Sequence, residues 1–137
     1  MKISTKGRYA MRLMLDLAKN QGEGFVALKD IAFRQGISKK YLEQIVPVLN
    51  NADMLKTNRG YQGGYRLAKV PEEYTAYDIL NTAEGGLAPV ACLDSEEINC
   101  PRNEYCATLP LWKGLNKAIK DYLTSITLQD ILNQKLA

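Results

Sequence analysis

Residues 28–51 read LKDIAFRQGISKKYLEQIVPVLNN, and this stretch decides the fold. Apolar residues recur at helical spacing on both sides of Gly36, which interrupts the pattern. Ser38 is a favourable N-cap for the second helix, whose apolar stripe begins at Tyr41 and ends at Leu49. Two helices joined by a short turn that contains glycine predict a helix-turn-helix, whose second helix enters a DNA major groove.

The second helix of this pair leaves long polar side chains facing outward near its start. They are Lys39, Lys40, Glu43 and Gln44. An ordinary helical hairpin whose polar face only meets water is the alternative interpretation. Pro47 removes a backbone hydrogen bond and crowds the carbonyl of Glu43, so we expect the helix to bend there and residues 38–46 to be its useful part.

A β-hairpin is predicted directly after the helix pair. Residues 54–58 and 65–67 read as two strands, and the connection RGYQGG at 59–64 is rich in glycine, which permits a tight reversal. Arg59 and Tyr61 lie near its tip. A basic hairpin that follows a helix-turn-helix is typical of a wing, which enters a minor groove or grips the DNA backbone.

The chain has 137 residues, enough for one compact unit with a hydrophobic core. Residues 1–69 carry 13 Lys and Arg against 5 Asp and Glu, a net +8, whereas residues 70–137 carry 5 against 10, a net −5. The basic half suits a polyanion such as DNA. No apolar run is long enough to span a membrane and the start does not resemble a signal peptide, so we expect a cytoplasmic protein.

The first helix is predicted from about residue 5 to residue 20. Lys6, Arg8 and Arg12 lie on or beside its polar face, where they either meet water or contact phosphate near the helix start. Thr5 and Lys6 are the candidates that we assign to DNA from this region.

The C-terminal part predicts a helix over about 76–84, a loop, a long helix from Leu109 and a short helix over 128–136. Apolar residues recur at alternating spacings of three and four along the long helix, as in a coiled coil. They are Trp112, Leu115, Ile119, Tyr122 and Ile126. This stripe either packs on the core of its own chain or, as we expect, forms a homodimer that binds a pseudo-palindromic operator.

The organisation that follows has three parts. We expect a winged helix-turn-helix DNA-binding domain over 1–84, a cysteine-containing loop over 85–107, and a dimerisation helix with a terminal helix over 108–137. The fold class is mainly α with a small β-hairpin.

The loop contains all three cysteines of the chain, Cys92, Cys100 and Cys106, in a chain without histidine. Their spacing matches neither a zinc ribbon nor a dithiol active site. Thiolates on a loop are suitable ligands for an iron–sulfur cluster. A redox thiol switch and incidental cysteines are the alternatives. Nothing in the chain resembles a nucleophile–base pair or a phosphate-cradling loop, so we do not expect an enzyme.

Five features carry a resemblance to a known family. They are the opening MKISTKGRYA, the segment ISKKYLEQI, the hairpin RGYQGGYRL, the three-cysteine loop, and LW followed by a long helix and ITLQDIL. Together they resemble the Rrf-type winged helix-turn-helix transcriptional regulators of bacteria, with IscR-, NsrR- and CymR-like members. The resemblance covers almost the whole chain and implies a homodimeric transcription factor, most simply a repressor, that binds double-stranded DNA.

The resemblance also implies roles for individual residues. The recognition positions are Ser38, Lys40, Tyr41, Glu43 and Gln44, and the wing comprises Arg59, Gly60, Tyr61, Gln62, Gly63, Gly64 and Tyr65. A carboxylate at Glu43 accepts from cytosine and repels guanine acceptors and phosphate, so it can select sequence by exclusion.

Cluster-binding members of the family use three loop cysteines, which match Cys92, Cys100 and Cys106; a [2Fe–2S] cluster is favoured over a [4Fe–4S] cluster. Leu109 stands where IscR-like members have a histidine ligand, and Lys6-Gly7-Arg8 where NsrR-like members have an aspartate. A loop carboxylate, Asp16 of a partner chain, water or an external thiol are open alternatives for the fourth ligand.

The first functional alternative is a cluster-free regulator of the same family, controlled by thiol oxidation or by a partner enzyme of cysteine metabolism. The second is a protein-interaction module that uses the helix-turn-helix to bind another protein.

Overall fold

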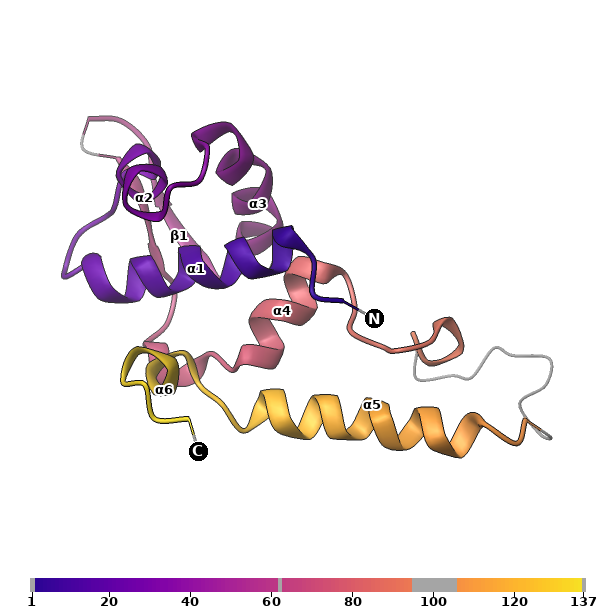
Figure 1. Ribbon diagram of the computed structural model, residues 1–137. Coiled ribbons are helices and arrows are strands. Elements are labelled where there is room, and N and C mark those ends of the chain that lie inside the picture. Colours follow the sequence, from indigo (N-terminus) through magenta and orange to yellow (C-terminus); the bar gives the residue numbers. More distant parts are fainter. Residues whose placement is uncertain (1, 62, 95–105, 137) are drawn as a thin grey trace.

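The computed structural model describes residues 2–61, 63–94 and 106–136 (Figure 1). In chain order its elements are α1 (Thr5–Asn20), α2 (Leu28–Gln35), α3 (Lys39–Asn51), β1 (Leu55–Asn58), β2 (Gly64–Leu67), η1 (Pro71–Glu73), α4 (Ala76–Glu84), η2 (Ala91–Leu93), α5 (Leu109–Thr124) and α6 (Leu128–Leu132). This order confirms the predicted fold class, a mainly helical winged helix-turn-helix with a small hairpin.

The helix α1 is the central element, since it contacts α2, α3, β2, α4 and α6. Apart from the buried Asp16, its inner face is apolar where it meets the other helices, and burial of such large apolar side chains contributes about 2 kcal/mol each. The largest fully buried side chains are Leu13, Met14, Leu17, Ile31, Leu42, Ile45, Leu49, Ile79 and Leu128. They come from five helices, so one core holds the whole globular part together.

The hairpin is antiparallel, with Leu55 opposite Leu67 and Asn58 opposite Gly64. Leu55 and Leu67 are buried, so the base of the hairpin is anchored in the core. Val26 adds a third strand position, because its N–H and C=O pair with the backbone of Tyr65 at 2.8 and 2.9 Å. The hairpin is therefore held at its base and also along β2.

Tyr74 connects the hairpin base to the C-terminal half. Its hydroxyl donates to the carbonyl of Met54 at 2.7 Å and accepts from the N–H of Lys69 at 3.1 Å. Burial raises the pKa of Tyr74 above its usual value, although the backbone hydrogen bonds partly oppose this. The neutral phenol therefore serves as a fixed structural contact.

The C-terminal elements differ in length from the prediction. The helix α5 ends at Thr124, and α6 begins after the capping box of Thr127 and Asp130 and ends at Leu132. The prediction of a helix to Leu136 was therefore wrong, because Gln134 adopts a positive φ of 55° just after the helix end. A backbone bridge between Thr75 and Thr127 places Leu128 in the core beside α1.

The helix α5 lies alongside α4 and extends away from the globular part (Figure 1). Leu109 is its only buried residue. None of the helices in the part of the chain that the structure describes is long and apolar enough to cross a membrane.

Candidate nucleic-acid interface

The turn between α2 and α3 has the geometry that the sequence predicted. Gly36 ends α2 in the left-handed conformation at φ 64°, and Ile37 donates its N–H to the carbonyl of Ala32 at 3.1 Å. Ser38 caps α3, because its Oγ accepts from the N–H of Tyr41 at 3.0 Å. This hydroxyl therefore fixes the start of α3, in addition to any contact with DNA.

The N-terminal half of α3 presents a polar face to solvent. Lys39, Lys40, Glu43 and Gln44 are all exposed, as predicted for a recognition helix. The Glu43 carboxylate lies 4.0 Å from the ammonium of Lys39, and both side chains are more than half exposed. Such a pair contributes little to stability, so both groups are available to a ligand.

Tyr41 faces the protein more than the solvent. Its ring is half-buried and meets the ring of Tyr9 edge to face, with centroids 5.4 Å apart. The guanidinium of Arg12 lies over the ring of Tyr9, 5.3 Å from its centroid. The aromatic pair thus anchors the start of α3 on α1.

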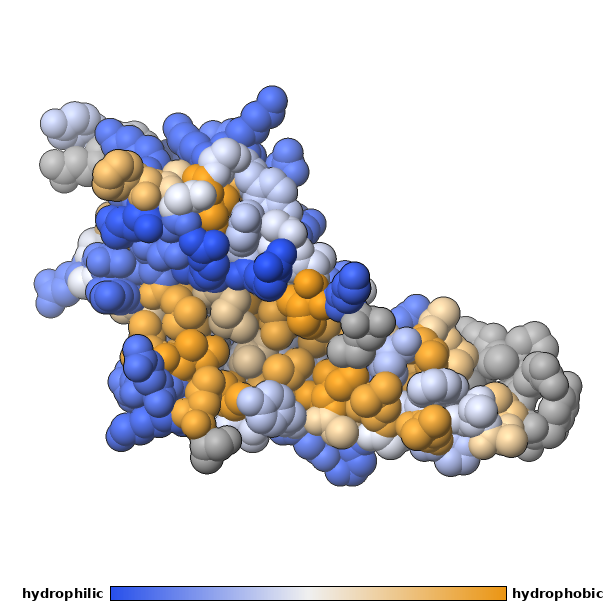
Figure 2. Space-filling view, in the orientation of Figure 1, coloured by the Kyte–Doolittle hydropathy of each residue, from blue (hydrophilic) through white to orange (hydrophobic). Residues whose placement is uncertain are grey.

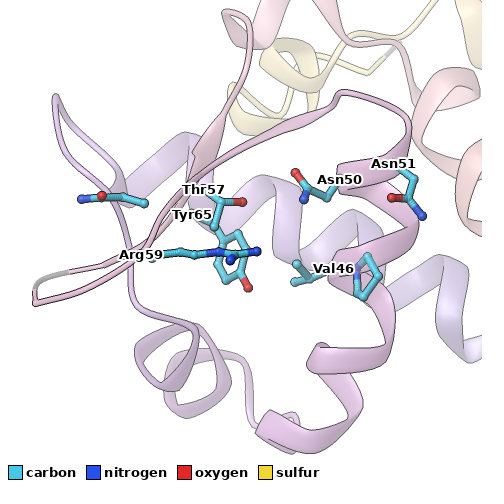
Figure 3. A pocket seen from close by; sticks show the side chains of 9 residues that line it. Val46, Asn50, Asn51, Thr57, Arg59 and Tyr65 are labelled. Atoms are coloured by element: carbon cyan, nitrogen blue, oxygen red, sulfur yellow. The ribbon is translucent and has the colours of Figure 1, made fainter.

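The helix α3 continues past Pro47 to Asn51. Its last turn lies beyond residues 38–46, the part that we predict to be useful for DNA, and forms one wall of a groove against the hairpin (Figure 3). Asn50, Asn51, Thr57 and Asn58 line this groove and were missed by sequence reasoning. The polar side chains alone do not indicate a groove, because the groove forms only where α3 and the hairpin come together in the folded chain.

The wing is shaped by close backbone approaches. Gly63 donates its N–H to the carbonyl of Gly60 at 2.9 Å, and Gly60 has a φ of 113°. A Cβ on Gly64 would overlap the carbonyl of Val26, so only glycine allows the third strand position. Tyr61 is 96% exposed at the tip, Arg59 is exposed and Tyr65 is half-buried, while Gln62 lies outside the described residues.

The first turn of α1 places Thr5 and Lys6 beside the end of α4. Ser4 caps α1 by accepting from the N–H of Gly7 at 3.1 Å, and Arg8 donates to the hydroxyl of Thr5 at 2.9 Å. The carboxylate of Glu84 accepts from both the N–H and the hydroxyl of Ser4, at 3.0 and 2.6 Å. The last residue of α4, directly before the cysteine loop, is thus bound to the start of α1.

A polar cluster joins α1 to the last turn of α2. The side chain of Asp16 is 1% exposed and accepts from Arg34 at 2.7 and 3.0 Å and from the Gln35 amide at 3.0 Å. Gln35 in turn accepts from Arg12 through its side-chain oxygen, at 3.1 Å, and through its backbone carbonyl. The hydrogen bonds of Arg12 bind it to Gln35 of α2, a contact outside the two roles, solvent and phosphate, that the sequence suggested.

Burial raises the pKa of Asp16, but the hydrogen bonds from Arg34 and Gln35 and the charge of Arg34 outweigh it and lower that pKa below its ordinary value. The same contact raises the pKa of Arg34. Asp16 therefore remains a carboxylate held inside its own chain. This engagement makes it unsuited to serve as the fourth ligand of a partner's cluster.

Two of the three predicted thiol ligands lie in the described part of the chain. Cys92 is half-buried on η2, and Cys106 is half-buried three residues before α5, with its Sγ 3.4 Å from the Thr108 hydroxyl. Cys100 lies outside the described residues. Both cysteines belong to the connection between α4, which ends at Glu84, and α5, which begins at Leu109.

The predicted dimer residues lie on α5 with one exception. Leu115 and Tyr122 are 40% and 58% exposed, and Trp112 and Ile119 are half-buried. Ile126 lies beyond the end of α5, where its carbonyl accepts from the N–H of Ala76 at 2.8 Å. The prediction that the apolar stripe continues along one helix to Ile126 was therefore wrong, since the chain turns after Thr124 to dock α6.

Comparison with known proteins gives concordant results. Residues 3–134 match the Rrf2 family model, described as iron-dependent transcriptional regulator. The HTH-type transcriptional regulator CymR of Bacillus subtilis is 44% identical over 96% of this chain and 89% of its own length. The HTH-type transcriptional regulator IscR of Pectobacterium carotovorum is 37% identical over 98% of this chain and 81% of its own.

Solved structures agree. The B. subtilis CymR structure, described as that of the global cysteine regulator, aligns over 98% of both chains at 41% identity with a TM-score of 0.77. The T. potens IscR structure aligns over 99% of this chain and 89% of its own, at 40% identity and the same TM-score.

Proposed function

This chain belongs to the Rrf2 family of transcriptional regulators, and we propose that it binds operator DNA as a homodimer through α3 and the wing. The observation that carries this proposal is the exposed polar face on the N-terminal half of α3, fixed by Gly36 and Ser38 and flanked by an anchored hairpin. This is the arrangement with which a winged helix reads a major groove and an adjacent backbone or minor groove.

The proposed contacts divide into base-reading and phosphate-binding groups. On α3, Glu43 and Gln44 would read base edges, and Lys39 and Lys40 would contact phosphate. The full set that we propose for DNA is Thr5, Lys6, Ser38, Lys39, Lys40, Tyr41, Glu43, Gln44, Arg59, Gly60, Tyr61, Gln62, Gly63, Gly64 and Tyr65. Tyr41 would act from its half-buried position, as a support for the helix start as much as a contact.

The dimer that we propose is formed by α5. An isolated helix of 16 residues is marginal in water, and this one buries only Leu109 within its own chain. Figure 2 shows apolar side chains gathered along α5 and between α5 and α1. Met11 and Leu15 of α1 are half-buried. A second copy would cover this apolar surface and place two recognition helices on one pseudo-palindromic site.

We propose the same three functional parts as the sequence suggests: 1–84 for DNA, 85–107 for the signal and 108–137 for dimerisation. Residues 108–137 would also stabilise the DNA-binding part, because Leu128 of α6 is buried against α1. Signal and DNA contact would be joined through Glu84, whose carboxylate binds Ser4 at the start of α1.

For the signal, we propose that Cys92, Cys100 and Cys106 bind an iron–sulfur cluster. The donor set fits, because soft thiolates are the usual ligands of these clusters and the two described cysteines are half-buried rather than sealed in the core. When bound, such a cluster supplies a group sensitive to iron and to oxidants. The chain contributes the thiolates and, through Glu84, a connection between their loop and α1.

A second candidate signal is thiol oxidation or a partner enzyme of cysteine metabolism, with no cluster. The observation that favours it is the similarity to B. subtilis CymR, which is described as a global cysteine regulator. The family description, iron-dependent transcriptional regulator, favours the cluster instead.

The test is an anaerobic purification followed by a visible spectrum with iron and sulfide analysis, on wild type and a variant with all three cysteines replaced by alanine. Visible absorption with stoichiometric iron and sulfide that is lost in the variant supports the cluster. A colourless, iron-free protein after attempted reconstitution overturns the cluster and leaves the thiol or partner mechanism. Binding of duplex DNA by both proteins is measured in parallel, since it does not depend on which signal is correct.

A further inference from the structure

A cavity of about 740 Å³ lies where α6 meets the C-terminal half of α1 and the end of α2. Figure 1 shows α6 close to that half of α1, which it contacts. In the described part of the chain the lining comes from these three helices and includes no residue of α3 or of the hairpin. The cavity is therefore separate from the surface that we propose for DNA.

One side of the cavity is apolar. Leu15 of α1 and Ile131 and Leu132 of α6 line it, and all three are half-buried, so part of their apolar surface remains uncovered. Sites for small molecules have volumes of about 300–1,000 Å³ and combine an apolar lining with a few polar groups that orient the ligand. The size and the apolar side of this cavity suit an organic molecule with an apolar body.

The other side of the cavity holds a fixed guanidinium. Arg34 donates from Nε and Nη2 to the buried carboxylate of Asp16, at 3.0 and 2.7 Å, in a two-pronged contact. Among the described residues no group accepts from its Nη1, and the side chain is 37% exposed. A planar guanidinium held in this way can still donate to an anion from its open side, with little loss of entropy on binding.

The charges of the lining favour an anion. They are two cations, Lys19 and Arg34, and one carboxylate, Asp16, which gives a net charge of +1. The carboxylate is already bound by Arg34, and the hydrogen bond between them raises the pKa of Arg34 above its ordinary value. Lys19 is exposed, and in the described part of the chain no carboxylate lies within 4.0 Å of its ammonium. One negative charge on a ligand would therefore balance the cavity.

We propose that this cavity binds a small organic monoanion, a carboxylate with an apolar body. Its carboxylate would accept from Arg34 and lie near Lys19, and its body would pack against the apolar side formed by α1 and α6. Such a ligand would contact α1, α2 and α6 together, and so would connect the first helix of the helix-turn-helix to the C-terminal helix. The inference does not depend on DNA binding.

The test uses hexanoate as the probe, added to the full-length protein labelled with ¹⁵N. Binding is followed by the NMR shifts of the Arg34 Nε–H and of the backbone N–H groups of Ile131 and Leu132. Acetate carries the charge without the body, and 1-hexanol carries the body without the charge. Lys19→Glu reverses a charge at the cavity, and Lys135→Glu makes the same change at an exposed residue outside its lining.

We expect hexanoate to cause saturable shifts at all three groups and to bind more tightly than acetate or 1-hexanol. Lys19→Glu should weaken hexanoate binding by about fivefold, because it replaces an attraction with a repulsion, and Lys135→Glu should leave it unchanged. The resonances away from the cavity check that each variant is folded, and the milder Lys19→Ala should give an intermediate affinity. Shifts that do not saturate, equal affinities for hexanoate and 1-hexanol, or equal affinities of the two glutamate variants would overturn the inference.

Discussion

Replacing Asp16 with asparagine tests whether the polar cluster of Arg12, Asp16, Arg34 and Gln35 holds α2 against α1. The change keeps the size of the side chain and removes only its charge and one acceptor. Asp16 accepts three hydrogen bonds from Arg34 and Gln35. Gln35 cannot reverse its amide without loss, because its Oε1 already accepts from Arg12 at 3.1 Å. An asparagine amide must therefore face a donor, either on Arg34 or on Gln35.

The magnitude follows from the burial of the pair. A hydrogen bond between charged groups contributes about 1.5–3 kcal/mol, and a buried donor left without an acceptor costs about 1–3 kcal/mol. The Arg34 side chain is 37% exposed and can turn toward water, which reduces the loss, whereas the Asp16 side chain is 1% exposed. We expect Asp16→Asn to lower the free energy of unfolding by about 2 kcal/mol.

The assay is urea unfolding at neutral pH and at one protein concentration, since a dimer gains stability with concentration. The matched control is Asp121→Asn, which removes the charge from a surface pair with Lys117 whose side chains are 60% and 77% exposed. That change should cost less than about 0.5 kcal/mol. If Asp16→Asn lowers the free energy of unfolding no more than Asp121→Asn does, the hydrogen bonds of Asp16 do not stabilise the junction of α1 and α2, which would refute the prediction.

Three further outcomes are expected. The pKa of Asp16 is lowered from 3.8 in the folded chain, so its contribution to the free energy of unfolding is present above that value and lost as the pH falls below it. The free energies of unfolding of wild type and Asp16→Asn should therefore converge in acid. A difference that stays constant with pH would contradict this. Gly7→Ala places a Cβ against the Glu84 carboxylate and should cost about 1–3 kcal/mol in thermal unfolding, partly restored when Glu84→Ala is added; an unchanged melting temperature would count against the contact. Leu115→Glu should convert the dimer to a monomer in sedimentation, whereas Lys113→Glu, exposed on the same helix, should not; a dimer in both would remove α5 from the interface.

Local signals explain what could be predicted from the sequence. Gly36 and Ser38 mark the turn between α2 and α3, and the capping box of Thr75 and Asp78 marks the start of α4, because each depends on residues within one helical turn. The glycines at 60, 63 and 64 likewise indicate the hairpin through backbone conformation alone. Such features do not depend on where distant parts of the chain lie.

The remaining features depend on tertiary pairing. Asp16 and Arg34 are 18 positions apart, and Ser4 and Glu84 are 80 apart, so no periodicity connects them. The end of α5 could not be located either, because the turn after Thr124 is set by the docking of Leu128 into the core. The groove beside Asn50 exists only once the hairpin is anchored on Val26.

The central claim is that the exposed face of α3 contacts DNA, and equilibrium binding of a selected duplex at several salt concentrations tests it most directly. Wild type is compared with Lys40→Ala on α3 and with Lys135→Ala, an exposed lysine near the C-terminus. We predict steeply salt-dependent binding whose slope falls by about one per protomer in Lys40→Ala and is unchanged in Lys135→Ala. Identical slopes for the two variants, or no binding of duplex DNA by the wild type, would contradict it.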